Sequence, residues 1–443
     1  MSFTELNKSG YAILNTLSKQ ILGADTTTAV SLSDFVSVGQ GLLSQRTDAV
    51  LGEVMQLVTN RIFKTKKYTG RFKLVYDSSG TTFNNRYMVT KFYPSDGFRQ
   101  SADYNCDGKT NFANGYDNGT NSGNSLGSMW EQKYQHSFTL NYGERQSWQK
   151  NITILENQMD EAFQSPEELA KWVGGIMSEY NNDIELAKEA FAKEALLNRI
   201  AGVYELATRS TNAVATESAV NLTKLFNDAM GTNYTSLQLR TDYLKDFMEF
   251  FAVTFRRYSD WLTHRSNKFH WSVPQQFTIV EDGTSTTVTK EYLTWADYSQ
   301  QRAVVFKDFI EDCKAQILPE IFHPELFPQG HYELVDYWQY WDTLDSRNGS
   351  VRPSIKVYPA IPDTTDLTAG QTTVTTAVEI PFLVGCIFTE GSVSAFANLQ
   401  KRRVTPVEAR KGYYNIWDTW QKSVINDFTE PCVVFYMADE ASA

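Results

Sequence analysis

A single helical pattern that begins near Ser165 constrains the fold of this chain more than any other feature. Ser165 is a typical N-cap residue, Pro166 suits the first position of a helix, and Glu168 completes a capping box. The apolar residues that follow recur at helical spacing: Leu169, Val173, Ile176, Tyr180, Ile184, Ala187, Phe191 and Ala195. No proline interrupts the pattern until well beyond residue 207. At about 1.5 Å per residue the helix would be roughly 60 Å long. A compact small domain cannot cover it, so the sequence predicts a spine within an extended subunit.

Before this helix, the hydrophobic pattern has the two-residue period of extended chain. Phe72, Leu74 and Tyr76 lie at alternate positions, a turn signal follows, and Tyr87 and Val89 resume the alternation. This pattern predicts a long β-hairpin. A polar stretch rich in Asn, Gly, Ser and Asp comes next, and we interpret it as an inserted excursion loop.

The remaining chain mixes helices and strands. Residues 1–65 show loosely amphipathic helical spacing, as expected of an arm that packs on something else, and residues 212–271 are mainly helical. Further strands are predicted in a hairpin and in two apolar runs: 274–300, 382–388 and 433–436. Residues 404–428 fit either a helix or a strand. The predicted class is α+β.

The composition of the chain limits the kinds of partner that it can bind. The 443 residues carry a formal net charge of −11, which argues against tight, charge-driven binding to nucleic acid. The most basic stretches, 61–73 and 401–403, are interpreted as solvated faces, with contact to an acidic neighbour or to DNA as the alternative. No apolar run is as long as a membrane span, and residues 1–10 show no secretion signal. We therefore expect a protein that folds in a cytoplasm and has no membrane partner.

The sequence contains none of the common motifs for nucleotide binding, serine hydrolysis or zinc-dependent catalysis. The four cysteines form no Cys-x-x-Cys pair, and Cys386 and Cys432 lie in apolar runs typical of a core. The five histidines match no metal-binding spacing and are interpreted as structural: His136, His264, His270, His323 and His331.

Two polar patterns could carry chemistry, and each has a simpler explanation. Asp103–Gly108 resembles the start of a calcium-binding loop, but the twelfth position is Asn114 rather than a glutamate. The carboxylate pairs 156/160 and 167/168 could serve glycoside hydrolysis. Such pairs are expected by chance among 52 acidic residues, and the second pair suits helix capping. We predict a protein that is not an enzyme and has no catalytic, cofactor or metal site.

Several segments are more characteristic of one protein family than any short motif in the chain: 165–172, 256–271, 322–325, 405–415 and 426–428. The elements also follow a characteristic order of arm, hairpin, capped spine helix, mixed central region and two terminal strands. In both respects the chain resembles the major capsid proteins of tailed bacteriophages, which have the Hong Kong 97-type fold, and is similar to those of small podophage-like and gut phages. The resemblance covers about residues 40–439.

The resemblance implies how the chain is divided. The implied regions are an N-terminal arm (1–68), an extended loop (69–150) with a polar insertion (95–128), a peripheral domain with the spine helix (151–210), an axial domain (211–380) and a return to the peripheral domain (381–443). The polar insertion fits the family pattern least. The function implied is that of a major capsid protein. It self-assembles into hexamers and pentamers of an icosahedral head that encloses the phage DNA genome.

The resemblance also implies contacts and partners. The hairpin of one subunit would lie across the spine helix of its neighbour, and the candidate intersubunit residues are Phe72, Leu74, Tyr76, Tyr87 and Val89. The implied partners are other copies of the chain, a portal protein at one vertex and scaffold or decoration proteins. Packaged double-stranded DNA would be contacted weakly and without specificity. The implied location is the virion, after assembly in the host bacterial cytoplasm.

Two alternatives stay open. The chain could be another virion structural protein, such as a portal or tail protein. It could also be a carbohydrate-binding protein or glycosidase, because aromatic residues make up 14% of the chain and one segment is rich in Asn and Gly. The second alternative would need a route of secretion.

Overall fold

The computed structural model describes the following residues: 11, 14–15, 18–19, 29, 31, 33–40, 87–95, 135–142, 146–155, 166–208, 217–281, 284–310, 332–339, 353–363, 371–408 and 410–439. They contain both long helices and several antiparallel sheets, which confirms the predicted α+β class. No helix among these residues is long and apolar enough to cross a membrane.

The body of the molecule is built around a five-stranded sheet. In spatial order its strands are β4 (Ala219–Asn221), β16 (Cys432–Met437), β13 (Phe382–Thr389), β7 (Gln301–Phe306) and β8 (Tyr332–Val335). Every residue of β13 and β16 is buried. Phe435 packs against Phe255 of α7 (Leu244–Leu262), whereas Tyr436 packs edge-on against Tyr204 of α4 (Pro166–Thr208). Helices therefore cover both faces, which explains why β13 and β16 are continuous apolar runs. Both strands confirm the sequence prediction.

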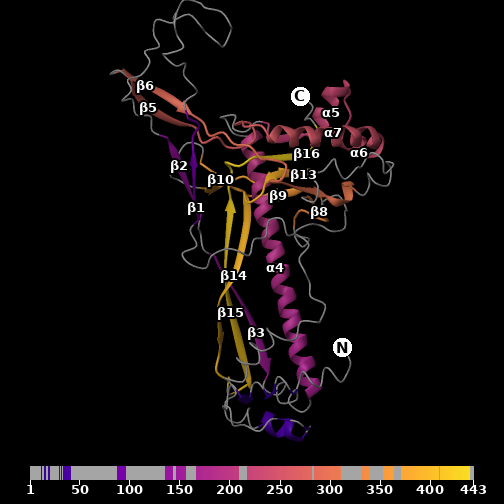
Figure 1. Cartoon of the computed structure of the whole chain (residues 1–443). Helices are drawn as coiled ribbons and strands as arrows, with labels where there is room; N and C mark the ends of the chain where they lie inside the picture. The colour runs from indigo at the N-terminus through magenta and orange to yellow at the C-terminus, as the bar shows by residue number, and fades with distance from the viewer. Residues whose placement is uncertain are drawn as a thin grey trace, which may run out of the picture.

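Helix α4 confirms the predicted spine. It begins at Pro166 and runs for 43 residues, which corresponds to about 65 Å. Its C-terminal half is buried in the body, where Ile200 and Ala201 have no exposed surface. Its N-terminal half extends away from the body (Figure 1). Ser165, the predicted N-cap, lies outside the described residues.

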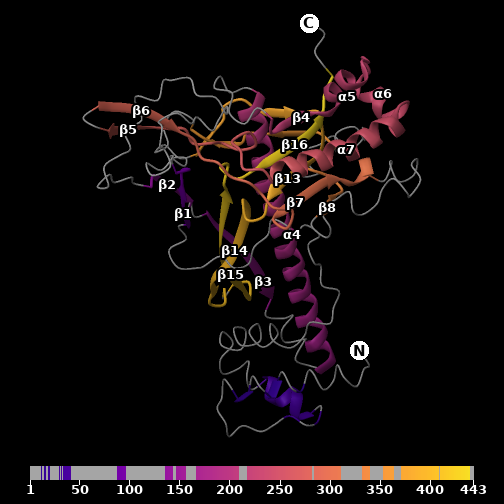
Figure 2. The same cartoon turned by 45° about the horizontal axis from the view of Figure 1, so that its top comes forward.

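A three-stranded sheet accompanies the N-terminal half of α4, and together they form what we call the leg (Figures 1 and 2). Its order is β14 (Val393–Val404), β15 (Tyr413–Asn426) and β3 (Gln146–Leu155), all antiparallel. Lys188 of α4 lies over the ring of Trp420, and Trp148 packs edge-on against Phe191. Because β15 is paired along both edges, most of the segment that fitted either a helix or a strand is a strand.

Two pairs of strands project from the same side of the body (Figure 2). The antiparallel pairing of β5 (Gln275–Glu281) with β6 (Thr284–Lys290) confirms the predicted hairpin, whose turn residues 282–283 lie outside the described residues. The ribbon, as we call the second pair, joins β1 (Tyr87–Phe92) to β2 (Ser137–Tyr142). The predicted strand at Tyr87 is confirmed. The segment predicted to pair with it, which contains Phe72, Leu74 and Tyr76, lies outside the described residues, as does the polar insertion.

Helices α5 (Leu222–Met230), α6 (Ser236–Thr241) and α7 confirm the helical interpretation of this region. Helix α5 begins at the N-cap Asn221 and ends at Gly231, whose φ of 65° lies in the left-handed region that favours glycine. Two small antiparallel sheets form within residues 355–380: β9 (Ile355–Val357) with β12 (Val378–Ile380), and β10 (Ala360–Pro362) with β11 (Gln371–Thr373).

Candidate functional site

The ribbon presents large apolar side chains to solvent. Met88 is 67% exposed and Phe92 is 58% exposed, while Thr90, between them, bonds across the ribbon to Thr139 at 3.0 Å. Successive side chains of a strand point to opposite faces, so Met88, Thr90 and Phe92 share one face. The opposite face carries half-buried Val89 and buried Lys91. The ribbon therefore has one exposed apolar face and one face turned toward the body.

Of the five candidate contact residues, the structure describes the backbone of two. Tyr87 and Val89 lie on β1, two positions apart and therefore on one face. Phe72, Leu74 and Tyr76 lie outside the described residues, so their contacts remain predictions. Met88 and Phe92 were not named from the sequence, although they lie on the same strand and point to its other face. The sequence indicated that two faces exist, but it did not show which one meets the body.

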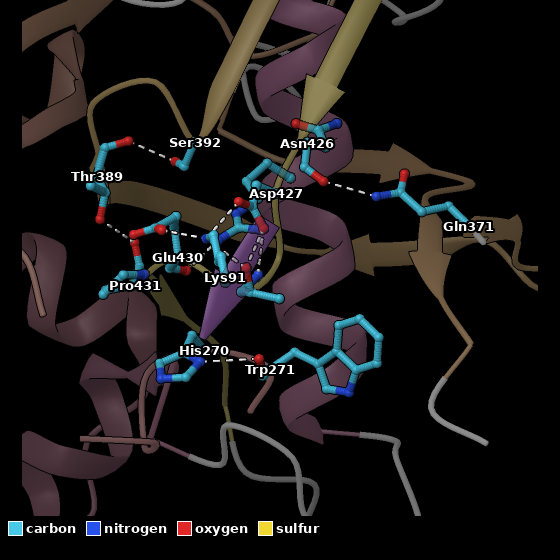
Figure 3. Close-up of polar contacts among 12 residues, drawn as sticks. Lys91, His270, Trp271, Gln371, Thr389, Ser392, Asn426, Asp427, Glu430 and Pro431 are labelled. Atoms are coloured by element: carbon cyan, nitrogen blue, oxygen red, sulfur yellow. Dashed lines mark hydrogen bonds and ion pairs between the residues drawn. The ribbon is translucent and has the colours of Figure 1, made fainter. Parts of the chain in front are cut away.

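A buried charge cluster anchors the ribbon to the body (Figure 3). Lys91 Nζ lies 2.7 Å from Asp427 Oδ2 and 2.8 Å from Thr429 Oγ1, and it also pairs with the Glu430 carboxylate. The backbone nitrogen of Thr429 donates to Asp427 Oδ1 at 3.0 Å. From α4, Arg199 Nη2 donates to the carbonyl oxygen of Glu430 at 2.6 Å. The ribbon, the spine helix and the turn between β15 and β16 thus meet at one point.

The two carboxyls of this cluster differ in their pKa. Burial lowers the pKa of Lys91, but the nearby Asp427 and Glu430 outweigh it and hold that pKa above its ordinary value. Burial also opposes ionisation of Asp427, yet the Lys91 charge and the hydrogen bonds from Thr429 hold the pKa of Asp427 below its ordinary value. For Glu430 burial prevails, and the pKa is raised. Asp427 is therefore the main anionic partner of Lys91, and Glu430 protonates first as the pH falls.

Aromatic packing provides a second anchor where the ribbon meets the hairpin. The ring of Tyr93, just beyond β1, lies 5.2 Å from that of Phe138 and 5.4 Å from that of Phe277 on β5. The Tyr93 hydroxyl donates to the carbonyl oxygen of Val273 at 2.8 Å. Val273 has a φ of 47°, which is unfavourable for a β-branched residue and is held here by the surrounding packing. The ribbon and the hairpin are therefore joined through their side chains.

An ion pair joins two strands of the leg sheet, and a hydrogen bond links this pair to the spine helix. Arg402 on β14 donates two hydrogen bonds of 2.8 Å to the carboxylate of buried Asp418 on β15, and the Tyr180 hydroxyl of α4 donates to the same carboxylate. The interpretation of 401–403 as a solvated face is therefore wrong for Arg402, because its guanidinium turns toward a buried carboxylate. Lys401 and Arg403 lie on the outer face and are exposed.

The leg leaves apolar residues uncovered on both of its outer faces. Leu155 and Trp417 are exposed on the sheet, and Leu186 is exposed on α4. These side chains lie on thin elements that face solvent in the single chain, so they are available to a partner.

The other sequence candidates have structural roles or lie outside the described residues. Cys386 and Cys432 are buried and free, and burial raises the pKa of both thiols, as expected of core residues. His270 is buried, and its ring nitrogens lie near the carbonyl oxygens of Trp271 and Ser266. His136 stacks on Phe277. Across the described part of the chain, no group of three or more His, Cys, Asp or Glu side chains could hold a metal ion. The calcium-like segment and the stretch 61–73 are not described.

Comparisons with known proteins gave matches among solved structures. No family model and no curated protein matches the chain. It is similar to the capsid structure of Staphylococcus phage Andhra at 10% identity and a TM-score of 0.47, covering 84% of this chain and 86% of that chain. It is also similar to the capsid structure of the Cyanophage P-SCSP1u at 10% identity and a TM-score of 0.41, covering 87% of this chain and 95% of that chain. Both matched structures are phage capsids.

Proposed function

We propose that this chain is the major capsid protein of a tailed bacteriophage, a structural protein rather than an enzyme. The observation that carries the proposal is the leg, in which the N-terminal half of α4 and three long strands cover each other on one side only. Leu186, Leu155 and Trp417 remain exposed on its outer faces. Elements this thin cannot bury their own outer faces, so neighbouring copies of the chain cover these faces in the assembly.

The ribbon supplies the reciprocal surface. Its exposed face carries Met88 and Phe92, and the Lys91 cluster fixes its base, so little conformational freedom is lost when the ribbon docks. We propose that the ribbon of one copy lies across the leg of the next. The contact includes these two residues together with three of the candidates named from the sequence: Phe72, Leu74 and Tyr76. The other two candidates, Tyr87 and Val89, lie on the face of β1 that turns toward the body, so they would support the contact from behind.

Repeated around an axis, such a contact joins different surfaces of successive copies and closes into rings. We propose hexamers and pentamers that close into an icosahedral head with the Hong Kong 97-type fold and enclose the DNA genome. Each contact is weak, and the shell is held by their number. The further partners are a portal protein at one vertex, scaffold or decoration proteins, and packaged DNA contacted weakly. Assembly takes place in the host cytoplasm, and the product is part of the virion.

The test is to purify the full chain and follow its assembly by sedimentation velocity and negative-stain electron microscopy over a concentration series, with and without a scaffold protein. We expect fivefold and sixfold rings or closed shells. Monomers alone at every concentration would contradict the proposal. Rings of another symmetry, or tubes, would favour a portal or tail protein. Tight binding on a glycan array without assembly would favour a carbohydrate binder.

A further inference from the structure

Helix α7 has one buried face and one charged outer face. Its inward side packs into the core through apolar residues: Leu244, Phe247, Met248, Phe251 and Phe255. Its outward side carries exposed residues three or four positions apart: Asp246, Glu249, Val253, Arg256 and Arg257. Val253, in the middle of this stripe, is 56% exposed. The outward stripe therefore has two carboxylates at one end, an apolar residue in the middle and two arginines at the other end, with exposed Lys245 beside the acidic end and half-buried Asp260 beside the basic end.

The helix dipole accounts for only part of this arrangement. A carboxylate in the first turn is stabilised by the dipole, and Asp246 occupies that position. Glu249 lies beyond the first turn, and the last turn has no basic residue, so Arg256 and Arg257 lie outside the reach of the dipole. Within the part of the chain that the structure describes, no ion pair joins any of these four side chains to a partner. These four charges therefore form no ion pair with any residue that the structure describes.

Exposed aromatic residues surround the basic end. Trp261 lies on α7, and Trp295 and Tyr298 follow in a segment held to α7 by a hydrogen bond of 2.8 Å from the Ala296 nitrogen to the Leu262 oxygen. The Tyr298 hydroxyl donates to Asp260 at 2.6 Å. Trp, Tyr and Arg are the residue types that contribute most to binding at protein interfaces.

We propose that the outward stripe of α7 is a contact between neighbouring copies of this chain, in which the acidic end of one copy lies against the basic, aromatic end of the next. This inference rests on the proposed function and names a second contact of the ring. Charge complementarity identifies the occupant, because one copy presents both halves of the pair. The centres of the two ends are about 13.5 Å apart along the helix, so two neighbouring helices bring opposite charges together when they are staggered. Helix α7 lies on the side of the body away from the ribbon and the hairpin (Figures 1 and 2), so the two contacts use different parts of the molecule.

Charge reversal tests the proposal. The acid-reversed variant is Asp246→Lys/Glu249→Lys, and the base-reversed variant is Arg256→Glu/Arg257→Glu. In each variant both ends of the stripe carry the same sign, so we expect the yield of rings or shells to fall at least tenfold. The quadruple variant has both ends reversed and is again complementary, so we expect it to assemble at close to the yield of the unmodified chain. An equimolar mixture of the two double variants should recover sixfold rings, because unlike chains can alternate around an even number of positions.

The control is Lys224→Glu, which reverses an exposed charge on α5 and should leave the yield unchanged. Circular dichroism and the thermal midpoint establish that every variant is folded. Double variants that assemble as well as the unmodified chain overturn the α7 contact and leave the proposed function standing. So does a folded quadruple variant that assembles as poorly as the double variants. An unmodified chain that forms no ring under any condition overturns both.

Discussion

Buried charge, as well as buried hydrocarbon, fixes the point at which the ribbon leaves the body. The side chains of Lys91 and Asp427 are 9% and 7% exposed, and they come from opposite ends of the chain. A buried ion pair adds little stability compared with a well-packed apolar pair, but removing one partner leaves an uncompensated charge. The cluster therefore holds the ribbon in one position more than it stabilises the fold.

Replacing Lys91 with methionine tests this role. We expect Lys91→Met to lower the free energy of unfolding of the unassembled protein by about 3–5 kcal/mol at neutral pH, because Asp427 is left buried and unpaired. In the native protein the lowered pKa of Asp427 gives stability that is present above its ordinary pKa of 3.8 and is lost as the pH falls through the folded-state value. In the variant the hydrogen bonds from Thr429 remain but the Lys91 charge is lost, so we expect burial to raise that pKa and stability to fall as the pH rises. Thermal midpoints at pH 4 and pH 7 measure the change of sign.

The double variant Lys91→Met/Asp427→Asn is the control. It removes both charges, so we expect it to recover most of the lost stability and to lose the pH dependence that Asp427 causes. Equal midpoints for the single and double variants at pH 7 would show that the charge of Asp427 does not matter at this point.

At Gly202 helix α4 packs closely against Phe428 in the turn after β15. A Cβ atom built there would lie 2.6 Å from the Phe428 ring, so one of the two must move. We expect Gly202→Ala to destabilise the protein by about 1–3 kcal/mol through overpacking. Gly175 lies on the same helix with nothing within 4 Å, so Gly175→Ala should stabilise by about 0.5–1 kcal/mol. Denaturant unfolding of both variants gives the comparison, and changes of the same sign would contradict it.

At the scale of elements, the predictions that succeeded are those with a clear period. Helix α4, hairpin β5–β6 and strands β13 and β16 were all predicted, because the spacing of apolar residues in each is regular along its length. Strand β15 was ambiguous. Its face toward α4 combines buried Asp418 with Trp420 and Lys422, so charge and burial do not separate as they do in a simple amphipathic strand.

The contacts between elements could not be predicted in the same way. The face of β1 that carries Lys91 turns inward, where Lys91 pairs with Asp427 and Glu430. The local sequence of β1 contains no sign of these distant partners. For the same reason Met88 and Phe92 were missed as exposed residues. The local pattern fixes which residues share a face, whereas the fold decides which face is covered.

The exposed face of the ribbon yields a prediction at this scale. We expect Met88→Ser/Phe92→Ser to reduce ring or shell formation at least tenfold, because burying the two side chains is worth about 3–6 kcal/mol in a packed contact. The thermal midpoint of the unassembled chain should change little, because both side chains are exposed there. Met230→Ser, at the end of α5, removes another exposed apolar side chain and is the matched control. Full assembly of the ribbon variant would exclude this face from the contact.

For the whole molecule, the division into body, leg and ribbon separates the part that stabilises the single chain from the parts that leave surface exposed for contact with other copies. The body has a core covered on both faces of its sheet, which stabilises the single chain. The leg and the ribbon extend from it with apolar surface left exposed, and they are held in place by the Asp418 and Lys91 ion pairs. A subunit that keeps its shape before it associates loses less entropy at each contact, so many weak contacts suffice for a stable shell.

The net charge of −11 limits how tightly the proposed shell can bind DNA. Tight binding to DNA depends on several phosphate contacts from clustered Lys and Arg, and the exposed basic residues of the leg sheet, Lys401 and Arg403, supply only two. We expect a Kd for duplex DNA weaker than about 10⁻⁴ M near 0.15 M salt, measured by fluorescence anisotropy. Adding duplex DNA should leave the yield of rings and shells unchanged. Micromolar binding that weakens steeply with salt, or assembly that requires DNA, would show that a basic surface dominates over the acidic balance of the chain. In that case the genome itself would be a partner in building the shell.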